Sequence, residues 1–302
     1  MNKSVHSTKL SNGQIMPLVG LGTFLLNSQD EMTNLLRAAL DAGYHRIDTT
    51  IIYQNEAMIG QALQDIYQQG KYTRKDLFIS LLDLQIDYID FYYLHFPLGF
   101  PNEKGEFHHL PVHVAWAQLE EACKLGLVKS IDVSNFHVMS LVDLLSYAKI
   151  KPVSNQVEVS IFIYQKNLIK FCQKYGIHVT AYAPLAKFND VESNPILQKI
   201  AKKHNASISQ VLLGFLLNQG LSVIPKTDKP ARLKQNFDSI HLKLSEEDLK
   251  ELETLNKNQR TIDPSTMQIM FHSLTEINLK NTILKQAFIF DNQIIIIHLF
   301  FL

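Results

Sequence analysis

Three side chains with complementary acid–base chemistry follow predicted strands in the first third of the chain. Asp48 ends one strand-like run, Tyr53 lies in the loop after it, and His95 ends a later run, "YYLH". A carboxylate, a phenol and an imidazole at one edge of a sheet could share protons and act on a polar bond. Each also has a structural explanation, because Asp48 could cap a turn, Tyr53 could pack and His95 could be a buried histidine. Their common place at strand ends favours a catalytic site.

The elements that would position these residues alternate between strands and helices. A hairpin comes first, because the "NG" of "STKLSNGQIMPLVG" separates two alternating apolar stretches. Amphipathic helical patterns then connect most of a series of short strands, as repeated βα units require. Eight strand-like runs are expected, at 18–22, 45–49, 76–80, 89–95, 128–134, 155–160, 178–184 and 222–225.

This alternation predicts an α/β protein, a (β/α)8 TIM barrel with an N-terminal β-hairpin, over residues 1–270. In such a barrel the loops after the strands form the active face, where the three candidate residues would lie. The alternative is an open doubly wound sheet, which requires a glycine-rich phosphate turn after an early strand. The corresponding stretch, "VGLGTF", has only two glycines, so the barrel is favoured.

One connection is too short for this pattern. The strands at 76–80 and 89–95 are separated by only eight residues, "LLDLQIDY". Parallel neighbours are normally joined by a dozen residues or more, usually including a helix. The eight residues resemble the end of such a helix without its beginning. We therefore expect a truncated third helix and apolar surface exposed beside it.

Composition and charge indicate which classes of binding partner and which cellular location to expect. The chain has 302 residues, 29 basic and 29 acidic side chains, and no basic stripe that would indicate nucleic acid binding. The sequence has no run of about 20 apolar residues, so it predicts no membrane span. The first residues lack the apolar segment of a secretory signal. The two cysteines, Cys123 and Cys172, are expected to be free thiols, and no metal site is indicated. These features favour the cytoplasm.

The C-terminal segment 271–302 differs from the rest. It is rich in Ile, Leu, Asn, Lys and Phe, and its run "IIIIHLFFL" is too short to span a membrane. We expect either a buried strand or, in preference, an atypical and aggregation-prone tail.

Several long motifs resemble one enzyme family. The pattern G-Y-x-R-I-D-T-x-x-x-Y-x-N-E-x-x-I-G at 43–60, the later "YLHFP" and "DVSNF", and "VIPKTDKPARLKQNFD" at 223–238 are similar to those of the aldo-keto reductase superfamily. The resemblance runs from about Lys9 to Met270. It implies a (β/α)8 barrel that reduces aldehydes or ketones with NADPH. It also implies a monomer, because the enzymes of this family are mostly monomeric.

The resemblance also assigns roles to the candidate residues. Tyr53 matches the proton donor, Asp48 matches the aspartate that holds a lysine beside that tyrosine, and His95 matches the histidine that orients the carbonyl oxygen. Phe24 and Phe96 are the expected walls of the substrate pocket.

The expected cofactor residues are spread over the strand ends. Those around the nicotinamide are Ser134, Asn135 and Gln156, which would hold its carboxamide, and Tyr182, which would stack on its ring. Two cations beside a helix start suit a 2′-phosphate, which favours NADP(H) over NAD(H). The residues at the adenosine half are Lys226, Thr227 and Arg232, with Gln235 and Asn236 near the adenine, and Gly22 and Thr23 belong to the first loop near the cofactor.

The chain departs from the family at the catalytic lysine. The family has a stretch like "FITTKLW" after the third strand, but this chain goes from "FIS" directly to "LLDLQ", and no lysine occurs between Lys75 and Lys104. Lys75 precedes the strand and would lie roughly 16 Å from the active face. Without the cation we expect Tyr53 to keep a pKa near 10 and Asp48 to lack a partner. Asp132 stands where the family usually has glycine, and its charge could strain the strand.

Three interpretations therefore remain open. The chain could be a working or weak NADPH-dependent reductase. It could be a non-catalytic protein that binds NADPH. It could also be a non-functional product of splicing or gene prediction, given the short connection and the unusual tail.

Overall fold

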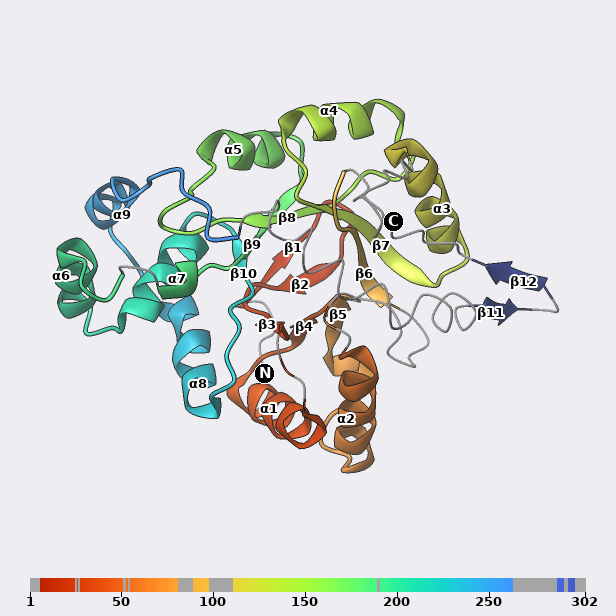
Figure 1. The fold of residues 1–302 in the computed structure, drawn as a ribbon, viewed down its shortest axis with the longest axis horizontal. Helices are drawn as coiled ribbons and strands as arrows, with labels where there is room; N and C mark the ends of the chain where they lie inside the picture. Colours follow the sequence, from red (N-terminus) through yellow and green to blue (C-terminus); the bar gives the residue numbers. More distant parts are fainter. Residues whose placement is uncertain are drawn as a thin grey trace, which may run out of the picture.

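The computed structural model describes residues 6–24, 26, 28–50, 53, 55–80, 89–97, 111–188 and 191–262, together with two strands at 287–290 and 293–296. Eight parallel strands form one sheet whose neighbours follow one another in sequence order. Figure 1 shows these strands at the centre of a ring of helices. They are β3 (Leu21–Gly22), β4 (Arg46–Asp48), β5 (Phe78–Ser80), β6 (Ile89–Leu94), β7 (Val128–Ser134), β8 (Ser154–Glu158), β9 (His178–Tyr182) and β10 (Ser222–Val223).

Backbone hydrogen bonds between the first and last strands close the sheet into a ring. The N–H of Gly20 donates to the carbonyl oxygen of Val223 at 2.9 Å, and the N–H of Val223 donates to that of Leu18 at 2.8 Å. A parallel bridge between Gly22 and Lys226 continues the seam. The sequential strand order and the closed seam exclude the open doubly wound sheet. The predicted (β/α)8 barrel is confirmed.

Helices surround the barrel and bury their apolar faces against it. In the part of the chain that the structure describes, a helix follows every barrel strand except β5. The helices are α1 (Gln29–Ala42), α2 (Glu56–Gln68), α3 (Val112–Lys124), α4 (Val138–Tyr147), α5 (Lys166–Lys174), α6 (Pro195–Lys203), α7 (Ile208–Asn218), α8 (Pro230–Asp238) and α9 (Glu246–Glu253). The 3-10 turns are η2 (Arg74–Asp76), η3 (Ala186–Phe188) and η4 (Ser239–His241).

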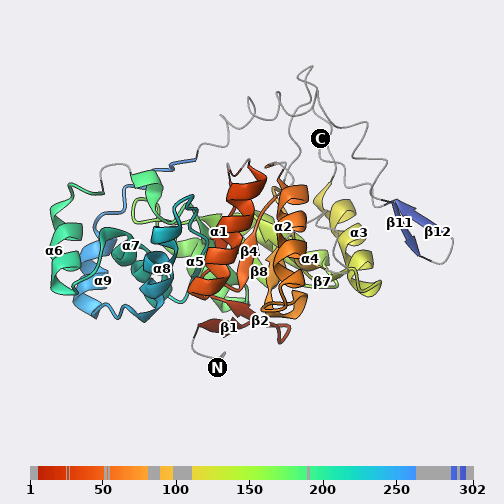
Figure 2. The ribbon, with the colours of Figure 1, turned by 90° about the horizontal axis from the view of Figure 1, so that it is seen from below.

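The N-terminal hairpin covers the end of the barrel where the strands begin (Figure 2). Its strands β1 (Ser7–Lys9) and β2 (Ile15–Pro17) are antiparallel, as the "NG" turn predicts. Met16 of β2 and Leu10 pack on a small apolar cluster with Phe78, Phe91 and Val153 from the barrel strands. This end is therefore filled by side chains, and the opposite end is left for the loops that follow the strands.

The short connection joins two strands that pair directly. Ser80 of β5 is the register partner of Phe91 of β6, and β6 begins only two residues earlier, at Ile89. The chain must therefore return only about 7 Å along the strand direction. Eight residues reach roughly 26 Å, so the short link is compatible with parallel pairing. The predicted truncation of the third helix falls on 81–88, outside the described residues, and stays a prediction.

Asp132 of β7 is accommodated by hydrogen bonds. Its Oδ1 accepts hydrogen bonds from the N–H groups of Val153, at 3.0 Å, and Ser154, at 2.6 Å. Burial raises the pKa of Asp132 to about 8, although these hydrogen bonds and the charge of Arg46 act to lower it. The carboxyl is therefore mostly neutral at pH 7 and ties β8 to β7, where a strained charge was expected.

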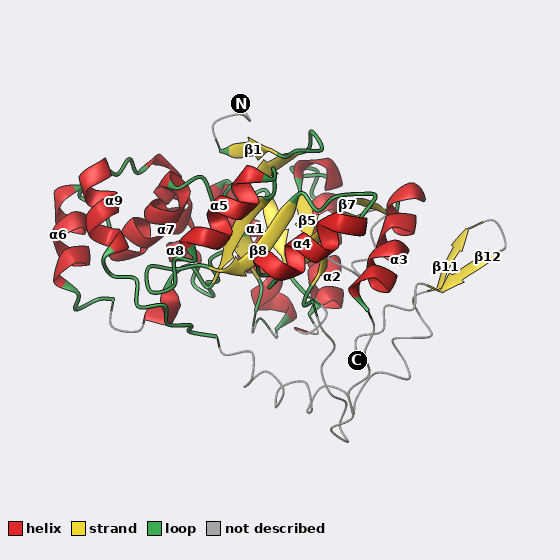
Figure 3. Cartoon of the chain, turned by 90° about the horizontal axis from the view of Figure 1, so that it is seen from above, coloured by secondary structure: helices red, strands yellow, loops and turns green. Residues whose placement is uncertain are grey.

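The remaining expectations on the fold concern the cysteines and the tail. Cys123 and Cys172 are both free thiols, as predicted. Two strands of the tail, β11 (Ala287–Phe290) and β12 (Gln293–Ile296), form a separate antiparallel sheet (Figure 3), and the rest of 271–302 lies outside the described residues. No helix in the described ranges is long and apolar enough to cross a membrane.

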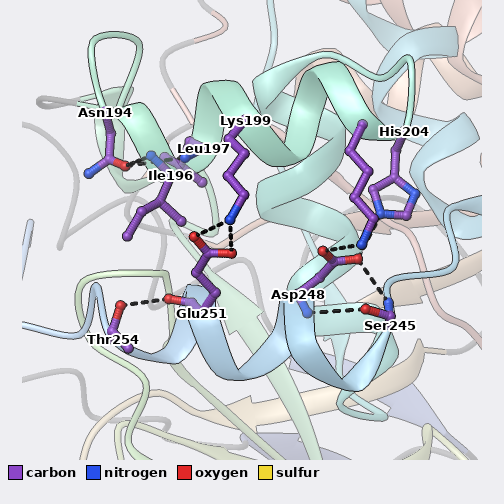
Figure 4. Close-up of polar contacts among 10 residues, drawn as sticks. Asn194, Ile196, Leu197, Lys199, His204, Ser245, Asp248, Glu251 and Thr254 are labelled. Atoms are coloured by element: carbon purple, nitrogen blue, oxygen red, sulfur yellow. Dashed lines mark hydrogen bonds and ion pairs between the residues drawn. The ribbon is translucent and has the colours of Figure 1, made fainter.

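A buried carboxylate fastens the two outermost helices, α6 and α9, to each other (Figure 4). Asp248 of α9 accepts a hydrogen bond from Lys203 at 2.8 Å and contacts His204 at 2.8 Å. Asp248 also forms a capping box with Ser245. Burial by itself would raise the pKa of Asp248, but the hydrogen bonds from these three residues outweigh it and lower the pKa well below its usual range.

Replacing this carboxylate should destabilise the fold in a pH-dependent way. We expect Asp248→Asn to lower the free energy of unfolding at pH 7 by about 1–3 kcal/mol, because a buried charge-assisted network is broken. A depressed native pKa stabilises the fold above the unfolded-state value of about 4 and loses that effect as the pH falls further. Urea unfolding should therefore show a difference between the two proteins above pH 5 that shrinks below pH 4.

The more exposed ion pair of the same two helices supplies the control. Glu251 contacts Lys199 at 2.8 Å, and Glu251→Gln should change the unfolding free energy by less than about 1 kcal/mol. Equal effects of the two substitutions would contradict the role given to Asp248.

Candidate active site

The candidate residues gather at the end of the barrel where the strands finish. Asp48 is the last residue of β4, and its backbone carbonyl accepts hydrogen bonds from the N–H and the hydroxyl of Thr23, both at 3.2 Å. Asn55, at the start of α2, is fully buried and donates to the carbonyl oxygens of Thr23 at 2.8 Å and Leu26 at 3.2 Å. Asn55 therefore holds the first loop against the end of β4.

Asp48 has partners, although the sequence led us to expect none. Its Oδ2 lies 3.5 Å from Nη2 of Arg46, which is fully buried, and accepts a hydrogen bond from Nε2 of Gln156 at 3.0 Å. The expectation of an unpaired carboxylate was wrong because Arg46 lies two residues before Asp48 on the same strand. Residues at this spacing point to the same face.

A second group of predicted residues meets at Asn135, directly after β7. Its Nδ2 donates to the carbonyl oxygen of His95 at 3.0 Å and to Oγ of Ser134 at 3.2 Å, and its Oδ1 accepts a hydrogen bond from the Tyr182 hydroxyl at 2.9 Å. The hydroxyl of Ser134 donates to the backbone carbonyl of Gln156. Asn135 has a φ of 61°, a left-handed conformation that asparagine tolerates better than most residues. Residues in or directly after β6, β7, β8 and β9 are thereby joined.

His95 is a neutral hydrogen-bonding group in this setting. Burial lowers the pKa of His95 to about 4, so the imidazole is uncharged at pH 7. Its Nδ1 lies 3.4 Å from the hydroxyl of Thr50, and its ring stacks on Phe96 at 4.9 Å. A neutral imidazole can donate one hydrogen bond and accept another.

Tyr53 is harder to ionise than expected. Burial raises the pKa of Tyr53 well above 10, and the nearby groups of Asp48 and Tyr182 raise it further. The expectation that this pKa stays near 10 was therefore wrong. The ring of Phe24 lies 5.0 Å from that of Tyr53, which places the expected pocket residue beside the expected proton donor. Lys75 lies in η2, before β5, and so on the far side of that strand from the site.

The predicted phosphate residues follow β10, next to the barrel seam. Glycine suits position 22, because a Cβ there would lie 3.1 Å from the carbonyl oxygen of Ile224, a tight contact with backbone. Lys226 is half-buried and 3.8 Å from Asp228, and Thr227 is buried, with its hydroxyl 3.1 Å from the N–H of Lys229. Along α8, Arg232 and Gln235 are exposed, whereas Asn236 is buried.

Comparison with known proteins gives the family. The aldo/keto reductase family matches the chain in two pieces, at residues 18–81 and 68–257. The chain belongs to this family. The first piece of the match ends one residue after β5, where the sequence lacks the lysine.

Relatives in this family match more than four fifths of the chain. Aldose reductase B of Dictyostelium discoideum is 38% identical, over 83% of this chain and 92% of its own length. Glyoxal reductase of Bacillus subtilis is 35% identical, over 88% and 98%.

The structure is also similar to those of solved members. The aldo-keto reductase of Bombyx mori in complex with NADP has a TM-score of 0.81 and 32% identity, and the match covers 87% of this chain and 96% of that one. Members of the family are oxidoreductases that use NADP(H) to reduce carbonyl groups, and the predicted cofactor is confirmed at this level.

Two residues of the site were not predicted from the sequence. Arg46 could have been found from its spacing to Asp48, because alternate residues of a strand share a face. Asn55 sits within the recognised motif, but its bonds to the first loop join elements that are distant in the sequence. No local pattern indicates them.

The neutrality of His95 can be tested directly. We expect its imidazole NMR signals to show no titration between pH 5.5 and 8, because burial holds its pKa near 4. His95→Gln would identify the signals. A midpoint near 6.5 would contradict the lowered pKa.

Proposed function

We propose that this chain binds NADP(H) and reduces aldehydes or ketones to alcohols slowly, because none of the residues that the structure describes supplies a cation that lowers the pKa of its proton donor. Bound NADPH would supply a hydride to the carbonyl carbon. The side chains at the ends of the strands would then hold the nicotinamide and stabilise the substrate oxygen that becomes an alkoxide.

The hydrogen-bonded group around Asn135 carries the proposal. The amide groups of Asn135 and Gln156, the hydroxyl of Ser134 and the ring of Tyr182 lie on the ends of adjacent strands. This set of donors and acceptors beside an aromatic ring is chemically suited to a carboxamide on a flat heterocycle. The residues present therefore fit the nicotinamide.

The other half of the cofactor would lie along the start of α8. Lys226, Thr227 and Arg232 would hold the 2′-phosphate, and Gln235 and Asn236 would lie near the adenine. The first turns of a helix attract anions through its free N–H groups. The exposure of Arg232 and the half-burial of Lys226 leave both side chains accessible to a ligand.

Proton transfer is the weak step. His95, neutral at pH 7, would donate a hydrogen bond to the substrate oxygen, and Tyr53 would give it a proton. The raised pKa of Tyr53 opposes stabilisation of the tyrosinate that this transfer leaves. Phe24 and Phe96, beside these two residues, would form the walls of the substrate pocket.

A second function, binding of NADP(H) without catalysis, is favoured by one observation. The sequence has no lysine between Lys75 and Lys104, so β5 and β6 bring none to the site. In either case we propose a cytoplasmic monomer with a barrel domain at 1–270 and a separate tail at 271–302.

Cofactor preference should depend on two cations. Lys226→Ala and Arg232→Ala should each weaken NADPH binding about tenfold or more and leave NADH binding nearly unchanged, because only NADPH has the 2′-phosphate. Fluorescence titration would measure both affinities. Lys234→Ala is the control, since Lys234 is exposed on the same helix and pairs with Asp238. Equal affinity of the unmodified chain for both cofactors would refute the assignment.

Restoring the lysine should restore the rate. Insertion of a family-like "TKLW" segment and helix after Ser80 should raise the reduction of a simple aromatic aldehyde roughly 10²–10⁴-fold. The same insertion with methionine in place of lysine separates the chemical effect from any gain in folding. If the methionine version were as fast, or if the unmodified chain already matched the restored one, proton donation would not be the limiting defect.

A further inference from the structure

Arg46 is a fixed cation inside the barrel. Its side chain is fully buried, and it donates hydrogen bonds to Oγ of Ser222 at 3.2 Å, to the Tyr93 hydroxyl at 3.2 Å and to Oγ1 of Thr180 at 3.4 Å. These partners come from β10, β6 and β9, so three other strands hold the guanidinium in place. A buried charge held in this way is favourable only if an opposite charge is close.

Asp48 supplies that charge and also contacts Gln156, at the end of the barrel where the strands finish. The same carboxylate oxygen, Oδ2, lies 3.5 Å from Nη2 of Arg46 and accepts the amide hydrogen of Gln156 at 3.0 Å. A hydrogen bond to an ionised acceptor is roughly twice as strong as one to a neutral acceptor. The orientation of the Gln156 amide therefore depends on the Asp48 carboxylate, which the Arg46 guanidinium supports from the same strand.

We propose that Arg46 is a positioning residue for the nicotinamide half of NADP(H), acting through Asp48 and the amide of Gln156. This inference rests on the proposed function, since it takes the rim at Gln156 as the nicotinamide site. In relation to the family's lysine, Arg46 takes over the anchoring of the aspartate. It does not take over the activation of the tyrosine, because the groups that shift the pKa of Tyr53 do not include Arg46.

The test compares two ligands that share the adenosine 2′-phosphate but differ in the nicotinamide. Calorimetric titration of the full chain with NADPH and with 2′,5′-ADP gives both dissociation constants. We expect Arg46→Met to weaken NADPH at least tenfold and to change 2′,5′-ADP less than twofold. Arg46→Lys, which keeps a cation, should recover part of the NADPH affinity.

Two controls separate positioning from general stability. Arg74 forms another largely buried pair, 2.8 Å from Asp90, at the end of the barrel where the strands begin, and Arg74→Met should alter neither dissociation constant. In the background of Asp48→Asn, Arg46→Met should have no further effect on NADPH, because Arg46 acts only through that carboxylate. This double variant also removes both buried charges, so it is testable even where Arg46→Met alone fails to fold.

The outcomes are distinct. Equal weakening of both ligands by Arg46→Met, unchanged NADPH affinity, or a further loss in the Asp48→Asn background would each overturn the inference alone. An unmodified chain that binds neither NADPH nor 2′,5′-ADP would instead refute the proposed function and the inference with it.

Discussion

Closure of the parallel barrel is the constraint on which the rest of the structure depends. Because all eight strands run in one direction and the last is bonded to the first, every strand finishes at the same rim. Residues as distant in the sequence as Asp48 and Gln156 then come within hydrogen-bond distance. The seam also brings the first loop beside Lys226, through the bridge between Gly22 and Lys226, so the loop after the first strand lies next to the proposed phosphate residues.

The absence of a lysine separates two effects that a single cation could combine. One effect is electrostatic support for a buried carboxylate, and the chain supplies it from within β4 through Arg46. The other is a lowered pKa for the neighbouring phenol, and the pKa of Tyr53 is raised. Guanidinium groups suit the first effect because they make several hydrogen bonds in fixed directions. A guanidinium group lowers the pKa of the phenol only if its side chain extends to the phenol.

Much of the fold could be predicted because its signals are local. Strand and helix patterns with a period of 2 and 3.6 residues identify the βα units. The "NG" turn identifies the hairpin that covers the end of the barrel where the strands begin. The motif "DVSNF" was enough to single out Asn135 as a candidate, and the structure places its amide against His95 and Tyr182; the roles of both residues toward a cofactor stay proposals. Electrostatic partnerships were not predictable, because the pKa of Tyr53 and the neutral state of Asp132 depend on burial and on contacts between distant strands.

The carboxyl of Asp132 has a consequence for proton balance. The formal net charge of the chain is zero at pH 7, but this count takes every carboxyl as ionised. An unfolded Asp132 is ionised at that pH, whereas the folded one, with a pKa of about 8, keeps its proton in most molecules. Folding at neutral pH therefore takes up most of one proton at this position. Unfolding releases this proton from the interior of the barrel to the buffer.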